Sequence, residues 1–174
     1  MPAPDTPNVR AARLARLRAA MARHQVDAVI VPSADPHLSE YLPGRWKGRE
    51  WLSGFTGSVG TFIATRDFAG VWTDGRYYTQ AEQELAGTEI RLMKIPSGAS
   101  LLHIDWLAAN LDEGKTVAVD ARVLGLAVAR LLGDALAARG VRLRTDLDLL
   151  DEIWSDRPGL PSAPVYEHVA PYAV

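Results

Sequence analysis

Residues 51–78 read WLSGFTGSVGTFIATRDFAGVWTDGRYY, and this stretch decides the fold. Residues 59–65 and 68–73 are rich in β-branched and aromatic side chains, which is typical of strands. Only the polar pair Arg66-Asp67 separates them. A break this short predicts a tight antiparallel hairpin.

Both ends of this hairpin carry turn-forming residues. Gly54, Gly57 and Gly60 stand at every third position before the first strand, and glycine permits a positive φ and close backbone approach. Asp74-Gly75 follows the second strand, and residues 76–85 have the apolar spacing of an amphipathic helix. Because both ends of a hairpin lie on one side, we expect the glycine loop and the charged turn to be neighbours.

Helical and strand-like stretches alternate through the rest of the chain. Residues 7–24 have helical apolar spacing after Thr6-Pro7, a favourable helix start, and short apolar runs indicate buried strands. The expected strands are residues 27–31, 90–95, 116–119 and 141–143. Three further helices are expected from their apolar stripes: Leu101, Ile104, Leu107 and Leu111 in the first, Leu124, Val128, Leu131 and Ala135 in the second, and Leu147, Leu150 and Ile153 in the third. This alternation predicts an α/β fold with a mixed β-sheet flanked by helices.

Single residues refine the helix that follows residue 120. Asp120 is expected to cap its start, and Gly140 to end it as a C-cap. Gly125 and Gly133 are eight positions apart and share a face, which predicts a helix that lies close to the sheet.

Residues 32–50 are expected to form a long polar loop, and long loops in compact domains are often functional. His37 lies beside Asp35 and three residues before Glu40, a setting suited to proton transfer or hydrogen bonding. A local turn network is the alternative interpretation.

The turn after the hairpin also allows two interpretations. Asp74 and Arg76 flank Gly75. They form a local ion pair, or Arg76 points outward towards a carboxylate of a partner or substrate.

Composition excludes several classes of protein. The formal net charge is −2, so no basic field favours a nucleic-acid partner. There is no cysteine, which excludes disulfides and thiolate metal sites. No apolar run has the length of a membrane span, and the N-terminus lacks a signal-peptide pattern. We therefore expect a cytoplasmic protein with one domain and an extension.

Common catalytic motifs are absent from the sequence. The glycine block precedes a strand, whereas a nucleotide-binding loop follows one, and Gly114-Lys115-Thr116 likewise leads into a strand. Neither Ser53 nor Ser58 lies in a nucleophile-elbow motif. The four histidines fall on separate elements without a metal-binding spacing: His24, His37, His103 and His168. The chain is therefore predicted to hold no catalytic residue and no metal site of its own.

The composition changes at Ser155. Four prolines follow without periodicity, which is typical of an extended linker: Pro158, Pro161, Pro164 and Pro171. We expect residues 1–6 to be disordered, residues 7–154 to form one domain, and residues 155–174 to lead to a further domain absent from this chain.

The sequence resembles the N-terminal domain of cytosolic-type, three-domain Xaa-Pro aminopeptidases (aminopeptidase P), members of the creatinase/prolidase superfamily. Four collinear blocks carry the resemblance: PSADPHLSEY at 32–41, WLSGFTGSVGT at 51–61, VWTDGRYYTQA at 71–81 and DEIWSDRPGLP at 151–161. The glycine block and TDGRY recur across the superfamily, whereas the other two blocks are more specific to the three-domain enzymes.

This resemblance implies the creatinase N-terminal fold, with ribonuclease H-like layering. It also implies a parent metallopeptidase that removes an N-terminal residue preceding proline, using two divalent, manganese-type ions. In the family the ligands of these ions are two Asp, one His and two Glu of a C-terminal domain, and none of those motifs is present here. The chain alone is therefore expected to be inactive and to need no cofactor.

The implied role of the domain is non-catalytic. It would help to cover the active site and support a homo-oligomer, expected to be a dimer. The implied partners are its own C-terminal catalytic domain and, for the parent, proline-containing peptides; neither nucleic acid nor membrane is expected. Five residues of the matching loops are candidates for substrate or interdomain contact: His37, Glu40, Phe55, Arg76 and Tyr77. We expect them to share one edge of the sheet, because as a set they are too polar and aromatic for a core.

Two other interpretations stay open. The chain could be a stand-alone creatinase-like module that binds proteins or peptides without catalysis, or a free-standing structural domain. The proline-rich tail favours the enzyme domain, because a linker implies more chain.

Overall fold

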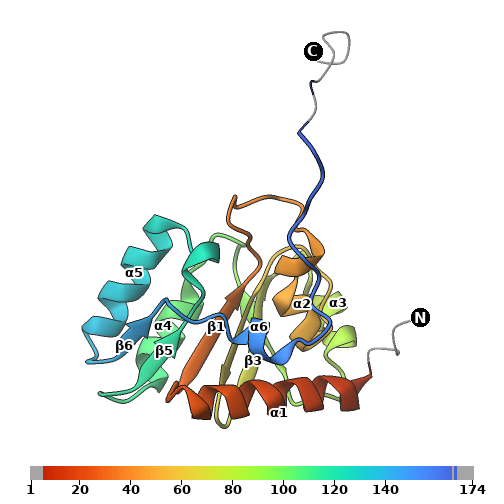
Figure 1. Cartoon of the computed structure of the whole chain (residues 1–174). Helices are drawn as coiled ribbons and strands as arrows, with labels where there is room; N and C mark the ends of the chain where they lie inside the picture. The colour runs from red at the N-terminus through yellow and green to blue at the C-terminus, as the bar shows by residue number, and fades with distance from the viewer. Residues whose placement is uncertain (1–5, 166, 168–174) are drawn as a thin grey trace.

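The structure, a computed structural model, describes residues 6–165 and 167. Helices and strands alternate along the chain (Figure 1). In order they are α1 (Pro7–Arg23), β1 (Ala28–Pro32), η1 (Gly44–Trp46), α2 (Gly48–Ser53), β2 (Thr61–Thr65), β3 (Ala69–Asp74), α3 (Tyr78–Glu84), β4 (Arg91–Ile95), α4 (Leu102–Asn110), β5 (Thr116–Ala118), η2 (Ala121–Val123), α5 (Leu126–Ala137), β6 (Arg142–Arg144) and α6 (Leu149–Ile153).

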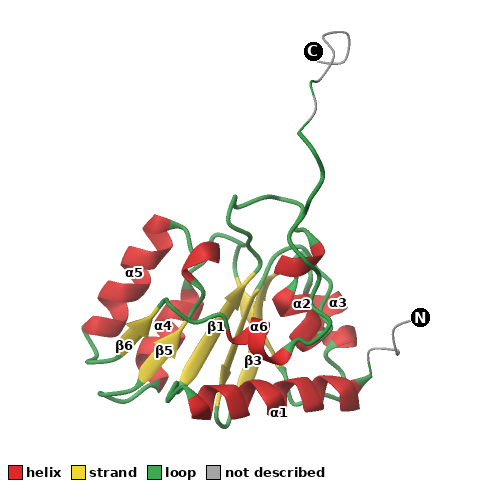
Figure 2. Cartoon of the chain, in the orientation of Figure 1, coloured by secondary structure: helices red, strands yellow, loops and turns green. Residues whose placement is uncertain are grey.

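The strands form one mixed sheet in the order β4-β3-β2-β1-β5-β6. Strand β2 is antiparallel to both neighbours, with Ile63 opposite Ile30 on β1 and Gly70 on β3. The other neighbouring pairs are parallel. The predicted α/β fold, a mixed sheet flanked by helices, is confirmed, and so is the tight hairpin at Arg66-Asp67 (Figure 2).

Helices cover both faces of the sheet, so strands must be apolar on both sides. Successive residues of β2 show this: Phe62 and Ala64 belong to the core cluster under α1, α2, α3 and α6, whereas Ile63 faces α4 and α5. This alternation follows from the two-residue period of a strand. The predicted stripe of the first helix is also confirmed, since Leu14 and Leu17 are buried.

Two predicted helix ends agree with the structure. The Val9 N–H donates to the Thr6 hydroxyl oxygen at 3.4 Å, and proline occupies the first position of α1. Gly140 has φ +65° just after α5, a conformation that favours glycine.

Three of the four residues of the stripe predicted for this helix, Leu124, Val128 and Ala135, pack against the core. Leu131 is the exception at 52% exposed, and the fully buried positions of α5 are Leu132 and Leu136. The predicted cap was wrong, because Asp120 caps the short η2 and α5 begins only at Leu126. The close packing expected at Gly133 is also absent, because a Cβ there would meet no atom within 4 Å.

The expected loop at residues 32–50 is partly helical, because it contains η1 and the start of α2. Trp46 and Arg49 on these turns are buried. Gly48 is required where α2 meets α6, since a Cβ would lie 2.2 Å from a methyl carbon of Leu150. The sequence did not indicate these helical turns, because the segment is polar and its apolar contacts come from distant parts of the chain.

Candidate functional site

The candidate site lies at the edge of the sheet where β1, β3, β4 and β5 end and β2 begins. We call the segments gathered there, residues 33–43, 54–60 and 74–77, the loop edge. The Thr73 hydroxyl donates to the carbonyl oxygen of Val59 at 2.7 Å, and the Ser33 N–H donates to that of Gly60 at 3.0 Å. The glycine loop and the charged turn are thus neighbours, as predicted.

Glycines are needed in this loop for two physical reasons. Gly54 has φ +72°, in the left-handed region. A Cβ on Gly57 would lie 2.3 Å from the Phe55 ring and 2.8 Å from the Tyr77 ring. The block therefore serves close packing, in agreement with its sequence position before a strand.

Arg49 holds the glycine loop from within the domain. Its side chain on α2 is only 5% exposed, and its guanidinium donates to the Ser33 hydroxyl and to the carbonyl oxygen of Phe55, each at 2.7 Å, and to that of Gly57. Burial lowers the pKa of Arg49 to about 10. Sequence reasoning missed this residue, since no spacing distinguishes it from the other arginines.

The Asp74 carboxylate is buried and pairs with Arg76. The Arg76 guanidinium contacts both carboxylate oxygens, at 3.0 and 2.8 Å, while its side chain is 64% exposed and that of Asp74 only 5%. Hydrogen bonds from Arg76 lower the pKa of Asp74. Of the two interpretations left open, the local ion pair is present, and the outer side of the guanidinium still faces solvent.

Phe55 does not have the exposed position expected for it. Its ring is 0% exposed and belongs to the core, so the expectation that all five candidates are too polar or aromatic for a core was wrong here. The ring packs edge-on against Tyr77, with centroids 6.0 Å apart. The Tyr77 hydroxyl lies 2.6 Å from the Ser58 hydroxyl, and this contact ties the turn to the glycine loop.

The segment around His37 is organised by Asp35. The Asp35 carboxylate is 2% exposed and accepts the N–H groups of His37 and Ser39, both at 2.9 Å. The hydrogen bond from the Ser39 N–H is the main cause that lowers the pKa of Asp35. The local turn network left open above is therefore present, and the His37 side chain is exposed.

The candidates Glu40, Arg76 and Tyr77 lie in two neighbouring places on the loop edge. Glu40 borders a hollow of about 180 Å³ with Arg49, Ser58 and Gly57. Arg76 and Tyr77 lie on the neighbouring turn, where the Arg76 guanidinium carbon is 5.4 Å from the Tyr77 ring centroid.

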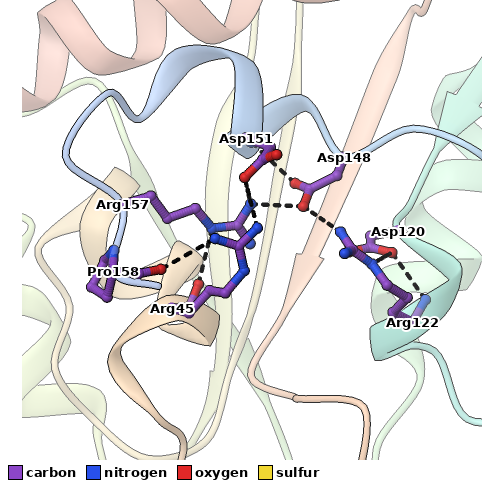
Figure 3. Close-up of polar contacts among 7 residues, drawn as sticks. All are labelled: Arg45, Asp120, Arg122, Asp148, Asp151, Arg157 and Pro158. Atoms are coloured by element: carbon purple, nitrogen blue, oxygen red, sulfur yellow. Dashed lines mark hydrogen bonds and ion pairs between the residues drawn. The ribbon is translucent and has the colours of Figure 1, made fainter. Parts of the chain in front are cut away.

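The chain leaves the domain beside this edge, and Arg157 fixes where it does so (Figure 3). The Arg157 side chain is 4% exposed; its Nη1 lies 2.7 Å from Asp148 Oδ2, and its Nε donates to the carbonyl oxygen of Arg45 at 3.1 Å. In return Arg45 donates to the carbonyl oxygen of Pro158 at 3.1 Å and to Asp151 Oδ1 at 2.7 Å.

Trp46 is the apolar centre of this network. The guanidinium carbons of Arg45, Arg122 and Arg157 lie 5.8, 5.2 and 5.6 Å from its ring centroid. Arg122 extends the network to Asp148 and to Asp120, at the end of β5. The segment after α6 therefore runs past the 33–43 loop as it leaves the domain (Figure 1).

Within the part of the chain that the structure describes, the side chains form no metal centre and the helices form no membrane span. No three His, Asp or Glu side chains among residues 6–165 and 167 come close enough to hold a metal ion. None of the helices there is long and apolar enough to cross a bilayer. Pro171 and His168 lie outside the described residues, as do residues 1–5 of the expected disordered N-terminus.

Comparison with known protein families and sequences identifies the family and relatives of this chain. Residues 13–153 match the creatinase/prolidase N-terminal domain family. The chain is 40% identical over 163 residues to aminopeptidase P1 of Arabidopsis thaliana, covering 92% of this chain and 25% of that protein. It is 36% identical to Xaa-Pro aminopeptidase 2 of Rattus norvegicus, covering 88% of this chain and 23% of that protein.

Solved structures give the same relationship. The X-prolyl aminopeptidase of Caenorhabditis elegans, described as a cytosolic enzyme with a di-nuclear active site, is similar with a TM-score of 0.79 and 33% identity, covering 87% of this chain and 26% of that one. The N-terminal domain of the cytoplasmic peptidase PepQ from Mycobacterium tuberculosis H37Rv shares the fold, with a TM-score of 0.59, 23% identity, and coverage of 82% of this chain and 98% of that one. The chain thus spans about a quarter of the length of its full-length relatives.

Proposed function

Because the chain belongs to the creatinase/prolidase N-terminal domain family, we propose that it is the non-catalytic N-terminal domain of an Xaa-Pro aminopeptidase. The parent would be a cytoplasmic hydrolase that removes an N-terminal residue preceding proline. Support comes from relatives with this activity in their names that are 36–40% identical over nearly the whole chain.

One observation carries the role of the domain: the chain leaves it beside the loop edge, held there by Arg157. A domain that follows would start next to the 33–43 loop and close to the turn at Arg76. We therefore propose that the loop edge, with His37, Glu40, Arg76 and Tyr77, faces the catalytic domain of the same or a neighbouring subunit and helps to cover its active site.

The proposal assigns the metal chemistry to that following domain. Two divalent ions, of the manganese type, would be held there, because the described residues of this chain form no ligand cluster. The domain would instead shape the approach of the proline-containing peptide and support a homodimer.

The test uses the complete protein that contains this chain. The complete protein should hydrolyse an Xaa-Pro peptide in the presence of Mn²⁺, and the 174-residue chain alone should not. A complete protein without this activity would overturn the proposed parent, and a stoichiometric, micromolar Mn²⁺ site on the 174-residue chain would overturn the division of labour.

A matched pair of variants tests the loop edge itself. Arg76→Ala in the complete protein should lower kcat/KM by about ten- to a hundredfold, as expected when a transition-state contact of about 1.4–2.8 kcal/mol is removed. Arg66→Ala is the control, because Arg66 also pairs with a neighbouring aspartate but lies at the opposite end of the same hairpin. Equal kinetics for both variants would leave Arg76 with its local pairing to Asp74 alone.

A further inference from the structure

Several large apolar side chains are exposed at one end of the domain. Leu38 and Tyr41, on the 33–43 loop, are 62% and 85% exposed. Leu102 begins α4 and Leu126 begins α5, and they are 45% and 67% exposed. Both helices start at this end because each follows a strand, β4 or β5, that ends at the loop edge (Figure 1). A single exposed leucine needs no explanation, whereas a group of them at one end of a domain indicates a contact surface.

A second hollow lies between these leucines, and we call it the apolar hollow. It has a volume of about 370 Å³ and lies where the strand ends meet the starts of α4 and α5. Its apolar wall is formed mainly by Ile30, Trp72, Ile95, Leu101, Val128 and Leu132. Leu38, Ser33 and Ser58 line it too, so the hollow continues the loop edge onto the α4 and α5 face of the sheet. Leu102 and Leu126 lie outside this lining; a small molecule within the hollow would leave them exposed, whereas the surface of another domain would cover both.

Leu38 is held in a strained conformation that exposes its side chain. Its φ is +55°, which is uncommon for a residue with a Cβ. The Leu38 N–H donates to the Asp35 carbonyl oxygen at 3.0 Å, within the turn that the Asp35 carboxylate also holds. One of its methyl carbons would lie 3.5 Å from a Cβ on Gly125, so the side chain reaches toward the start of α5. Strained residues are concentrated at functional sites, and an exposed leucine adds little to the core, so this conformation favours a contact outside the domain.

The place where the chain leaves the domain indicates which partner covers this surface. The chain spans about a quarter of the length of its full-length relatives, so under the proposed function a further domain follows it. The exit segment passes directly beside the end of the 33–43 loop, since a Cβ on Gly44 would lie 3.3 Å from Pro158. A tethered domain has an effective concentration on the order of millimolar, so a contact of a few leucines suffices to hold it. A free partner would need an interface of about 800 Å² on each side.

We propose that the apolar hollow and the leucines beside it, Leu38, Leu102 and Leu126, dock an apolar surface of the domain that follows this one in the parent protein. This inference rests on the proposed function, because it needs a parent with a following domain. It adds a place and a chemistry to that function. An apolar contact on the α4 and α5 face holds the two domains together, while the polar residues of the loop edge face the active site.

The first test compares the 174-residue chain with the complete protein by hydroxyl-radical footprinting, which measures the solvent access of single side chains. Leu38 and Leu126 should react at least about threefold more slowly in the complete protein, because a docked domain excludes water from them. Leu131 is also exposed on α5 but lies outside the hollow and further from the loop edge, so it should react equally in both. Unchanged rates at Leu38 and Leu126, or equal slowing at Leu131, would overturn the proposal.

A matched pair of variants tests the contact in the complete protein. Leu126→Glu and Leu131→Glu make the same change at two exposed positions of α5. Leu126→Glu should return the reactivity of Leu38 to within about twofold of its value in the 174-residue chain, because a charge in an apolar contact opposes docking. Leu131→Glu should leave Leu38 protected. Equal effects of the two variants, or continued protection in Leu126→Glu, would contradict the proposed place of docking.

Leu38→Asn supplies an independent variant, because asparagine tolerates a positive φ better than leucine does. It should restore the reactivity of Leu126 in the complete protein and leave the urea midpoint of the 174-residue chain unchanged or higher. Continued protection of Leu126 would show that Leu38 takes no part in the contact and would overturn the proposal.

Three further results separate this proposal from the proposed function and from a second copy. An active peptidase with an unprotected Leu38 would overturn the docking alone, whereas a protected Leu38 in a complete protein without peptidase activity would support the docking and overturn the proposed activity. Sedimentation velocity of the 174-residue chain at about 100 µM should give a monomer, since the exposed leucines are too few for a free dimer. A dimer that Leu126→Glu dissociates would assign the hollow to a second copy and overturn the proposal.

Discussion

Replacing Arg49 with methionine tests whether a buried cation stabilises this domain. The change removes three hydrogen bonds from the guanidinium, to the oxygens of Ser33, Phe55 and Gly57, and keeps an apolar side chain of similar length. No salt bridge is lost, because the described residues offer this guanidinium only neutral oxygens as hydrogen-bond partners.

The structure gives the two opposing contributions. Hydrogen bonds from a charged donor contribute about 1.5–3 kcal/mol each, so three contribute about 4.5–9 kcal/mol. The lowered pKa of Arg49, about 10, reports the unfavourable burial of the charge, and the fall from its ordinary value corresponds to about 3 kcal/mol. The balance favours the native arginine, and we expect Arg49→Met to lower the free energy of unfolding by about 3 kcal/mol.

The assay is urea unfolding of the 174-residue chain at pH 7, followed by tryptophan fluorescence. Arg66→Met serves as the control, because that side chain is 90% exposed and should have little effect on the midpoint. Amide exchange of residues 55–60 should also accelerate in Arg49→Met, since the loop loses its anchor. A loss below about 1 kcal/mol, or a gain in stability, would refute the reasoning, because burial of the charge would then outweigh its hydrogen bonds.

Three further predictions concern stability. Arg157→Met should cost about 2–3 kcal/mol in urea unfolding because it leaves the half-buried Asp148 carboxylate with Arg122 as its cation, whereas deleting residues 158–174 should cost less than about 1 kcal/mol; the reverse order would contradict the role of Arg157. Burial lowers the pKa of His103 in the folded chain, so on acidification the unfolded chain binds a proton at this histidine at a higher pH than the folded chain does. The free energy of unfolding should therefore fall as the pH falls through about 6.5. If the free energy of unfolding of His103→Leu depends on pH with the same slope, His103 is excluded as the cause. Asp35→Ala should cost about 1–2 kcal/mol, by analogy with the loss of a capping side chain, and should speed proteolysis within residues 35–39; resistance equal to the native chain would show that the turn holds without the carboxylate.

The sequence predicted those parts of the fold that depend on neighbouring residues. The hairpin at Arg66-Asp67, the cap at Thr6, the helix end at Gly140 and the contact between the glycine loop and the turn are all confirmed. Each follows from spacing or from backbone chemistry within a few residues, which a single sequence displays directly. The family resemblance is confirmed as well.

The α5 helix shows where such local reasoning reaches its limit. Most of its apolar stripe was predicted, but its start was not, because Asp120 caps a separate short helix before α5 begins at Leu126. Leu131 fits the spacing of the stripe but is exposed, and only packing against the sheet decides which residues at the border of the stripe are buried.

The candidate site depended most on tertiary structure. Its loop residues, and the local turn at Asp35, were identified from the sequence, but Arg49 and Arg157 have no local pattern that separates them from surface charges. The partners of Arg45 show why: its guanidinium meets the carbonyl of Pro158, 113 positions along the chain. Local spacing and backbone preference thus determined the elements and their turns. Only the folded chain decided that Arg49 and Arg157 are buried, because each guanidinium is buried where separate segments of the chain bring oxygens to meet it.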